Sequence, residues 1–310
     1  MASCPIDSRV VILSEAKDLC IPRLQANAWV LSLRLAQSHD DNGDLWLRAC
    51  ERARYLSAMS KLLALLLLFT GTLATAQEII VAAAADMNAA LPQIVEAYTK
   101  ETGQAVKISF GSSGNLTNQI RNGAPFDIFF SADEEYPKQL IAEGLASKDT
   151  LYRYAVGRLA LWVPSNSPLN VSKLGILALL DPSVKKISIA NPAHAPYGRA
   201  AEAALRHFGI YDQVSSRLVL GENVAQAASF VNSGNAQAGL IALSQALLAK
   251  KRSLYWEVPL DAYPALNQAA VVLSRSKQRD AARKFLEFLR SPEATSLLGS
   301  YGFSVPVEKH

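Results

Sequence analysis

The chain has 310 residues, of which 50% are hydrophobic and 19% are charged, and it carries a formal net charge of +4. That hydrophobic content supplies a substantial buried core and excludes a wholly disordered protein. The charge does not fit a general polyanion binder, because the basic clusters are short and have no interleaved aromatic residues.

A signal peptide is the first element that the sequence predicts, over residues 59–76. Lys61 supplies a basic start, the run Leu62–Phe69 is apolar, and the small-residue triplet Ala74-Thr75-Ala76 would release Gln77 as a new N-terminus. The apolar run is shorter than the roughly twenty residues that a membrane-spanning helix needs. The pattern therefore favours secretion over a membrane anchor.

Residues 1–58 show no clear periodicity, repeat or motif ahead of Met59. We interpret them as the product of an upstream start or as an unstructured extension, with a real additional segment as the alternative. All three cysteines lie in this segment, at Cys4, Cys20 and Cys50. Because residues 77–310 contain no cysteine that could carry a lipid anchor, we expect a soluble protein in the periplasm.

Strands and helices are predicted to alternate from residue 79 onward. The first strand, Ile79–Ala84, precedes a helix over 88–102 whose apolar residues recur at helical spacing. The unit repeats, with strands expected at 105–110, 127–130, 186–190, 217–220 and 238–242, and helices at 113–121, 134–143, 197–207 and 223–231. Two further helices, 279–289 and 292–301, close the chain. This alternation predicts the α/β class, with parallel sheets covered by helices.

Two long apolar stretches, 152–163 and 269–274, break the alternation and are predicted to cross between two lobes. The result is a two-lobed fold with a two-strand hinge and a cleft. Ligands of open α/β sheets bind beyond the carboxyl ends of the strands, where helices begin. The predicted lobes comprise 77–155 plus 270–310 for the first and 156–269 for the second.

The junction Ser109–Leu116 combines two glycines with two serines. Gly111 and Gly114 let the backbone approach a ligand closely, while the hydroxyls of Ser112 and Ser113 and the first amides of the helix offer uncharged donors. This pattern favours an oxyanion site, and the alternative is that one serine merely caps the helix. A serine hydrolase is disfavoured, because the segment lacks the G-x-S-x-G motif.

The next junction places Pro196 at the start of an alanine-rich helix. Proline suits the first helical position, and the amides of Tyr197 and Gly198 are then expected to point out of the helix end. His194 lies nearby without a Cys, Asp or Glu at metal spacing, which favours a structural role over a metal ligand.

Two more junctions complete the candidate site. Asn223 is a predicted N-cap, with Gln226 three residues on as in a capping box, and the Val224 amide would face outward; an ordinary capped helix is the alternative. Asp86 follows the first strand, where it could cap the first helix. Its carboxylate would repel an anion if it faced the cleft, so its role stays open.

Seven segments of residues 77–310, by their order and spacing, resemble the periplasmic molybdate-binding proteins of ABC transporters. They are Val81–Leu91, Ser109–Leu116, Gly123–Asp127 with Ser131–Asp133, Pro196–Ala200, Gly221–Gln226 and Tyr301–Phe303. The resemblance implies a type II periplasmic-binding-protein fold. It implies a monomeric protein that is not an enzyme and that has no cofactor and no nucleic-acid partner. It also implies capture of molybdate or tungstate for a membrane permease.

Carried over by position, the resemblance implicates the hydroxyl and amide of Ser113 and the amides of Tyr197 and Val224, and Asp86 is the fourth candidate ligand residue. Asp86 departs from the serine or threonine of many family members. Ala242 stands where some have a ligand-binding tyrosine, and Tyr197 could supply that hydroxyl.

Three other functions stay open on the sequence alone. The same fold could bind phosphate or sulfate, and Asp86 could then accept a hydrogen bond from hydrogenphosphate. It could also host a transferase or hydrolase, although the deaminases that resemble it use a cysteine that residues 77–310 lack. An effector domain of a transcription regulator would need a DNA-binding motif where the signal peptide is predicted.

We expect the protein recovered from a periplasmic extract to begin at Gln77, because the small-residue triplet before it fits signal peptidase cleavage. Mass spectrometry of the intact protein measures this end directly. An uncleaved chain that starts at Met1 and stays in the cytoplasm would contradict the secretion prediction.

Overall fold

The computed structural model describes Tyr55 and residues 78–249 and 253–305. The chain divides into two units, Met1–Leu73 and Ala74–His310, and the fold below is that of the described residues of the second. The predictions for residues 1–58 and for the signal peptide 59–76 lie outside the described residues. Within the described part of the chain, no helix has both the length and the apolar character needed to cross a bilayer.

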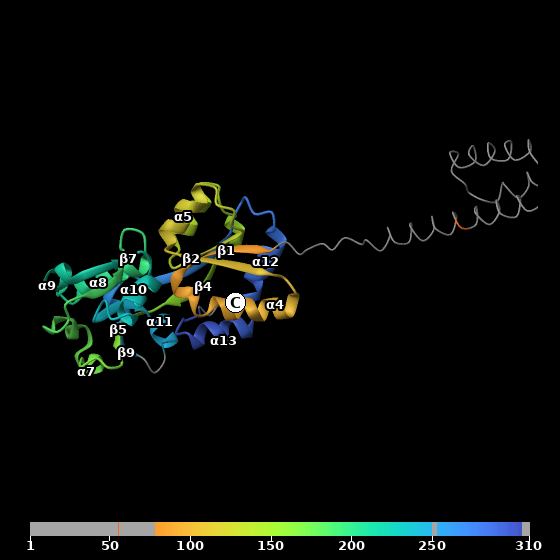
Figure 1. The fold of residues 1–310 in the computed structure, drawn as a ribbon. Helices are drawn as coiled ribbons and strands as arrows, with labels where there is room; N and C mark the ends of the chain where they lie inside the picture. The colour runs from red at the N-terminus through yellow and green to blue at the C-terminus, as the bar shows by residue number, and fades with distance from the viewer. Residues whose placement is uncertain (1–54, 56–77, 250–252, 306–310) are drawn as a thin grey trace, which may run out of the picture. The chain divides into compact units, whose positions relative to one another are not determined.

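Two five-stranded sheets form the frame of this unit (Figure 1). The predicted two-lobed α/β fold is confirmed. The first sheet has the order β2 (Val106–Gly111), β1 (Ile79–Ala84), β3 (Ile128–Ser131), β10 (Leu266–Val272) and β4 (Tyr152–Gly157). The second has the order β7 (Leu218–Gly221), β6 (Ile187–Ala190), β8 (Ala238–Ala242), β5 (Leu159–Pro164) and β9 (Ser253–Glu257).

Neither sheet is wholly parallel, contrary to the simplest form of the prediction. In the first sheet β1 is parallel to β2 and β3, whereas β10 is antiparallel to β3 and β4. In the second sheet β6 is parallel to β7 and β8, whereas β5 is antiparallel to β8 and β9. The antiparallel strands β5 and β10 each follow directly after a crossing between the sheets.

Helices cover both faces of the first sheet. Ile79, Val81 and Ala83 of β1 share a core with α4 (Leu91–Thr102), α12 (Arg279–Phe288) and α13 (Pro292–Ser300), while Ala82 faces α5 (Ser113–Arg121) and α6 (Glu135–Ala142). The ring centroids of Tyr98 on α4 and Phe285 on α12 are 4.9 Å apart. The closing helices therefore pack on the first sheet, as predicted (Figure 1).

The second sheet is covered mainly by α8 (Pro196–His207) and α10 (Val224–Asn232), which contact its central strands. Short elements complete the described unit. They are α7 (Val171–Leu174), α9 (Tyr211–Val214), α11 (Leu243–Leu248) and the 3-10 helices η1 (Ala85–Asn88), η2 (Lys148–Thr150), η3 (Gly175–Leu180), η4 (Ser215–Arg217) and η6 (Leu260–Ala262). The sequence patterns did not predict α11 or the edge strand β9, because both are too short to show a clear period.

The chain passes between the sheets at two places. The first crossing is the predicted stretch 152–163, which divides at Arg158 into β4 and β5. The second is the segment 258–265, and the stretch 269–274 does not cross, because β10 pairs with β3 and β4 throughout. Strand pairing thus places 156–157 and 266–269 with the first sheet, whereas the sequence analysis assigned them to the second lobe.

Gly198 allows the start of α8 to lie against the end of β6. A Cβ atom at Gly198 would come within 2.3 Å of the Ala190 carbonyl oxygen and 2.8 Å of the Asn191 carbonyl carbon. Both atoms belong to the backbone, so neither can move aside as a flexible side chain would. This close approach brings the helix N-terminus to the carboxyl end of the strand.

We expect Gly198→Ala to lower the free energy of unfolding by about 1–3 kcal/mol, because the new methyl group overpacks this contact. Gly299→Ala is the matched control, since a Cβ atom added to Gly299 in α13 would have no neighbouring atom within 4 Å. Alanine has the higher helix propensity, so the control should be neutral or stabilising by up to about 1 kcal/mol. Urea denaturation measures both, and equal effects would contradict the proposed contact.

Candidate functional site

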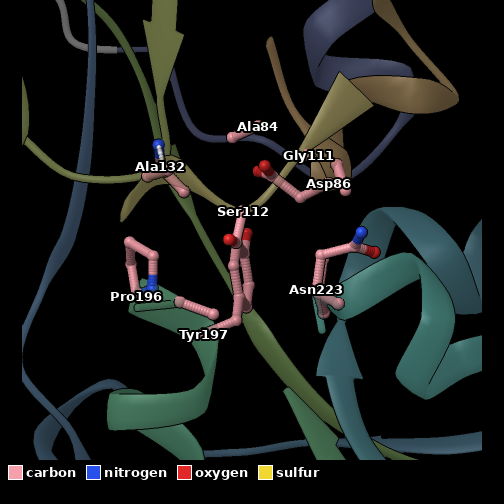
Figure 2. Close-up of a pocket in the computed structure, with 12 residues that line it drawn as sticks. Ala84, Asp86, Gly111, Ser112, Ala132, Pro196, Tyr197 and Asn223 are labelled. Atoms are coloured by element: carbon pink, nitrogen blue, oxygen red, sulfur yellow. Dashed lines mark hydrogen bonds between the residues drawn. The ribbon is translucent and has the colours of Figure 1, made fainter. Parts of the chain in front are cut away.

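One small pocket lies where the ends of three strands and the starts of three helices come together (Figure 2). All four residues that the sequence analysis selected, Asp86, Ser113, Tyr197 and Val224, line it. The other lining residues are Ala84, Ala85, Gly111, Ser112, Ala132, Ala195, Pro196 and Asn223. Among these described lining residues there is no lysine and no arginine, so an anion here would be held by neutral donors.

The first of the three helix starts belongs to α5. Ser112 is its N-cap, whose Oγ accepts a hydrogen bond from the Asn115 amide at 3.4 Å, and the Gly114 amide donates to the His194 carbonyl at 2.9 Å. The Ser113 amide has no acceptor among the described residues. Its hydroxyl oxygen accepts from the Ala132 amide at 3.0 Å, which leaves the hydroxyl proton free to donate into the pocket.

The second helix start belongs to α8, where Pro196 occupies the first turn as predicted. The Tyr197 amide has no acceptor in the described part of the chain. The prediction of a donor pair was wrong, because the Gly198 amide bonds to the Ala195 carbonyl at 3.0 Å. Because the first turn pairs the Gly198 amide with the Ala195 carbonyl, the Tyr197 amide is the one donor of this turn that faces the pocket.

The third helix start belongs to α10. Asn223 is its N-cap, and its Oδ1 accepts from the amides of both Ala225 and Gln226 at 3.0 Å. The Gln226 side chain accepts from the Glu222 amide at 2.7 Å. A capping box would have paired it with the amide of the N-cap residue Asn223, so the observed bond lies one residue earlier. With those donors paired, the Val224 amide is left without an acceptor among the described residues.

Three unpaired amides and one hydroxyl thus meet at this pocket from helices of both sheets. Amides in the first turn of a helix cannot bond within that helix, and each helix dipole places partial positive charge at the same end. Such an arrangement binds anions without a charged side chain. The chemistry of the donor set fits a compact oxyanion with several acceptor oxygens.

Asp86 does not occupy the N-cap position of the first helix. The N-cap of η1 is Ala84, and the Asp86 carboxylate lies within the first turn, close to the backbone amides of Asp86 and Met87. Instead Asp86 is fully buried, its Oδ2 accepts a hydrogen bond from Gln268 Nε2 at 2.5 Å, and its Oδ1 has no partner. Figure 2 shows the carboxyl group directed towards the interior of the pocket. The sequence could not reveal this, because Gln268 lies 182 residues away.

A buried polar cluster surrounds Asp86. Tyr154 donates to Gln268 Oε1 at 2.7 Å, and Gln268 Nε2 also lies 3.3 Å from the Tyr197 hydroxyl oxygen. Sequence reasoning missed Tyr154 and Gln268. The available signal was Gln268 itself, a polar residue in the strand Leu266–Val272, in which only Asn267 is also polar. The Tyr197 hydroxyl thus lies beside Asp86, while Ala242 is buried at the end of β8 and does not line the pocket.

Burial controls the acid-base properties of this cluster. It raises the pKa of Asp86 from 3.8 to about 7, and hydrogen bonds from Gln268, from the backbone amides of Asp86 and Met87 and from the Tyr197 hydroxyl oppose the rise. Burial and the neighbouring Asp86 also raise the pKa of Tyr154 and Tyr197 well above 10, so both stay protonated donors. The carboxyl group of Asp86 is consequently the member of the cluster that changes charge near neutral pH.

Polar contacts between the two lobes lie around the pocket. Arg199 Nη2 lies 2.5 Å from Asp133 Oδ2, and Asn115 Nδ2 lies 3.2 Å from Glu222 Oε1. His194 Nδ1 lies 2.9 Å from Ser112 Oγ. Within the described residues, no group of three or more His, Cys, Asp or Glu side chains could hold a metal ion. These contacts hold the two lobes together at the edge of the site.

A family model for bacterial extracellular solute-binding proteins matches residues 79–304. The chain belongs to that family. The molybdate-binding protein ModA of Rhodobacter capsulatus is 38% identical to this solute-binding protein over 230 residues, covering 74% of the chain and 89% of the relative. The protein of the same name from Azotobacter vinelandii is 40% identical over 234 residues, covering 75% and 92%.

A solved structure supports the same assignment. The periplasmic molybdate-binding protein of Azotobacter vinelandii superposes on this solute-binding protein with a TM-score of 0.70 and 35% sequence identity, over 74% of this chain and 100% of that one. The family resemblance seen in the sequence is therefore confirmed. The matched region, from residue 79, contains every residue of the pocket.

Replacing Asp86 by asparagine is expected to change how stability depends on pH. Because its pKa is raised to about 7 in the folded protein, the folded state holds a proton that the unfolded chain releases near pH 3.8. Stability is therefore lost progressively as pH rises from about 4 to about 7, and it levels off above 7. Asp86→Asn, which cannot ionise, should gain about 2–3 kcal/mol relative to the wild type between pH 5 and pH 8.

Urea denaturation of both proteins, freed of bound anions, at pH 5 and pH 8 measures this gain. Asp261→Asn is the control, because Asp261 is exposed on η6 and should follow the wild type. A constant difference between wild type and Asp86→Asn at the two pH values would contradict a neutral buried Asp86.

Proposed function

We propose that this solute-binding protein captures molybdate or tungstate in the pocket and delivers the anion to the permease of an ABC transporter. The observation that carries the proposal is the convergence of three unpaired helix amides, from Ser113, Tyr197 and Val224, with the Ser113 hydroxyl at one pocket. The protein acts as a receptor and not as an enzyme, and it needs no cofactor.

The energetics favour a dianion in such a site. Each hydrogen bond to a charged group contributes about 1.5–3 kcal/mol, and each helix end adds about 0.3–1 kcal/mol at exposed sites and more when buried. Four such donors offset the cost of immobilising one small ion. An uncharged pocket also permits release, because separation of the lobes would withdraw the donors of α8 and α10 from those of α5 together.

The named relatives support this ligand and a periplasmic location, since two are called molybdate-binding proteins and the solved structure is called periplasmic. Export through the predicted signal peptide 59–76 fits that location. We further propose that the receptor works as a monomer and binds no nucleic acid.

Titration calorimetry of the purified protein with molybdate, tungstate, sulfate and phosphate tests the proposal. Molybdate and tungstate should bind most tightly. Tighter binding of phosphate or sulfate would instead favour a receptor for another tetrahedral oxyanion, and phosphate is the anion that an ionised Asp86 could favour by accepting its proton.

Two variants test the donors themselves. Ser113→Ala should weaken molybdate binding about ten- to a hundredfold, because one charge-assisted hydrogen bond is lost. Val224→Pro should weaken it similarly, because proline removes the amide at the first helical position, where its ring is tolerated. Ser229→Ala, on an exposed part of α10, is the matched control and should bind as the wild type does.

Calorimetry gives the dissociation constants, and circular dichroism confirms that each variant is folded. Wild-type affinity in both Ser113→Ala and Val224→Pro would show that the anion binds elsewhere.

A further inference from the structure

Asp86 presents a conflict in an anion-binding pocket. It lines the pocket, it is fully buried, and one of its oxygens has no hydrogen-bond partner. An ionised carboxylate at this place would repel a dianion strongly, because burial removes the water that screens such charges. A neutral carboxyl group would instead add a donor to the site.

The polar cluster determines which oxygen of the neutral acid carries the proton. Tyr154 donates to Gln268 Oε1, which turns the Gln268 amide nitrogen towards Asp86 Oδ2. An oxygen that accepts from an amide at 2.5 Å is the acceptor end of the carboxyl group. The proton therefore belongs on Oδ1, the oxygen without a partner.

We propose that Asp86 enters the complex as a neutral carboxylic acid whose Oδ1 donates a hydrogen bond to the oxyanion, so that each dianion binds together with one proton. The inference rests on the proposed function. The proton comes from solvent when Asp86 is ionised in the free protein, and it returns there when the anion leaves. Gln268 acts as a positioning residue, since it bonds to Asp86 but does not itself line the pocket.

Affinity for the anion should then depend on pH in a specific way. With a pKa of about 7 in the free protein, Asp86 is neutral at pH 6, and affinity should be constant below that value. Above pH 7 the dissociation constant should rise about tenfold per pH unit, because the ionised form must first be protonated. The protons taken up per anion should increase from about 0.1 at pH 6 to about 0.9 at pH 8.

Other ionisable groups around Asp86 are few within the described residues. Tyr154 on β4 and Tyr197 on α8 have pKa values well above 10. Further out lie His194, Glu222 and the pair of Asp133 with Arg199, where burial raises the Asp133 pKa. From α11, the side chains of Ser244 and Gln245 bond to the carbonyls of Asp86 and Ala85 and carry no charge.

Calorimetric titration of the full protein with sodium molybdate, in buffers of different ionisation enthalpy at pH 6, 7 and 8, measures affinity and proton uptake together. The wild type should show the uptake given above. Asp86→Asn keeps a neutral donor of the same shape and should bind molybdate with no uptake and no change of affinity with pH.

Asp127→Asn is the matched control, because Asp127 is also buried but bonds to the Ile80 amide and the Ser276 hydroxyl away from the pocket. It should keep the wild-type uptake. His194→Gln should also keep the uptake, since His194 lies at the edge of the pocket, with its Nδ1 2.9 Å from Ser112 Oγ, and does not contact Asp86.

Two results would overturn the inference and leave the proposed function intact: molybdate binding by the wild type without proton uptake, or uptake that persists in Asp86→Asn. Uptake that disappears in His194→Gln but not in Asp86→Asn would assign the proton to His194 and also overturn it. Absence of binding by the wild type at all three pH values would refute the proposed function, and the inference with it. Because the wild-type titrations decide the first point alone, the test does not depend on the stability of a variant.

Discussion

A backbone amide in the first turn of a helix has no acceptor within that helix, and it must find a partner elsewhere or face a ligand. In α5, α8 and α10 the neighbouring amides are paired locally, by Ser112, by the Ala195 carbonyl and by Asn223. One donor per helix remains at the pocket. The rest of the site depends on this shortage of acceptors, because the unpaired amides create a positive potential at the pocket. No cationic side chain is needed there, and such a cation would hold the anion too tightly for release.

The sheets bring these helix starts together. β1, β2 and β3 end at the pocket, and short connections lead from the ends of β6 and β7 to the starts of α8 and α10 that also line it. Close backbone contacts fix the distances, since a Cβ at Gly198 would meet the Ala190 carbonyl oxygen. A Cβ at Gly157 would come within 2.3 Å of the Tyr197 hydroxyl oxygen. The hinge strand and the start of α8 therefore lie in contact, which couples the arrangement of the lobes to the side chains around Asp86.

Much of the donor geometry follows from local sequence. Pro196 suits the first helical position, Asn223 suits an N-cap, and the glycines and serines of Ser109–Leu116 suit a tight strand-to-helix turn. These preferences act over a few residues, so they can be recognised before the fold is known. The same locality explains the errors of detail. Whether the Gly198 amide is paired, or which amide Gln226 reaches, depends on about one ångström of turn geometry that residue types do not specify.

The sequence by itself determined the α/β class, the two lobes, the family and the position of the helix starts, because hydrophobic periodicity and capping residues are local properties. Only the tertiary structure decided the state of Asp86. Asp86 is buried among residues that are distant in the chain: Gln268, to which it bonds, lies 182 positions away, and Tyr197 lies more than 100 positions away. A carboxyl group responds to the dielectric and the donors around it, and these are set by the packing of β1, β4, β10 and α8 and not by neighbouring residues in the chain.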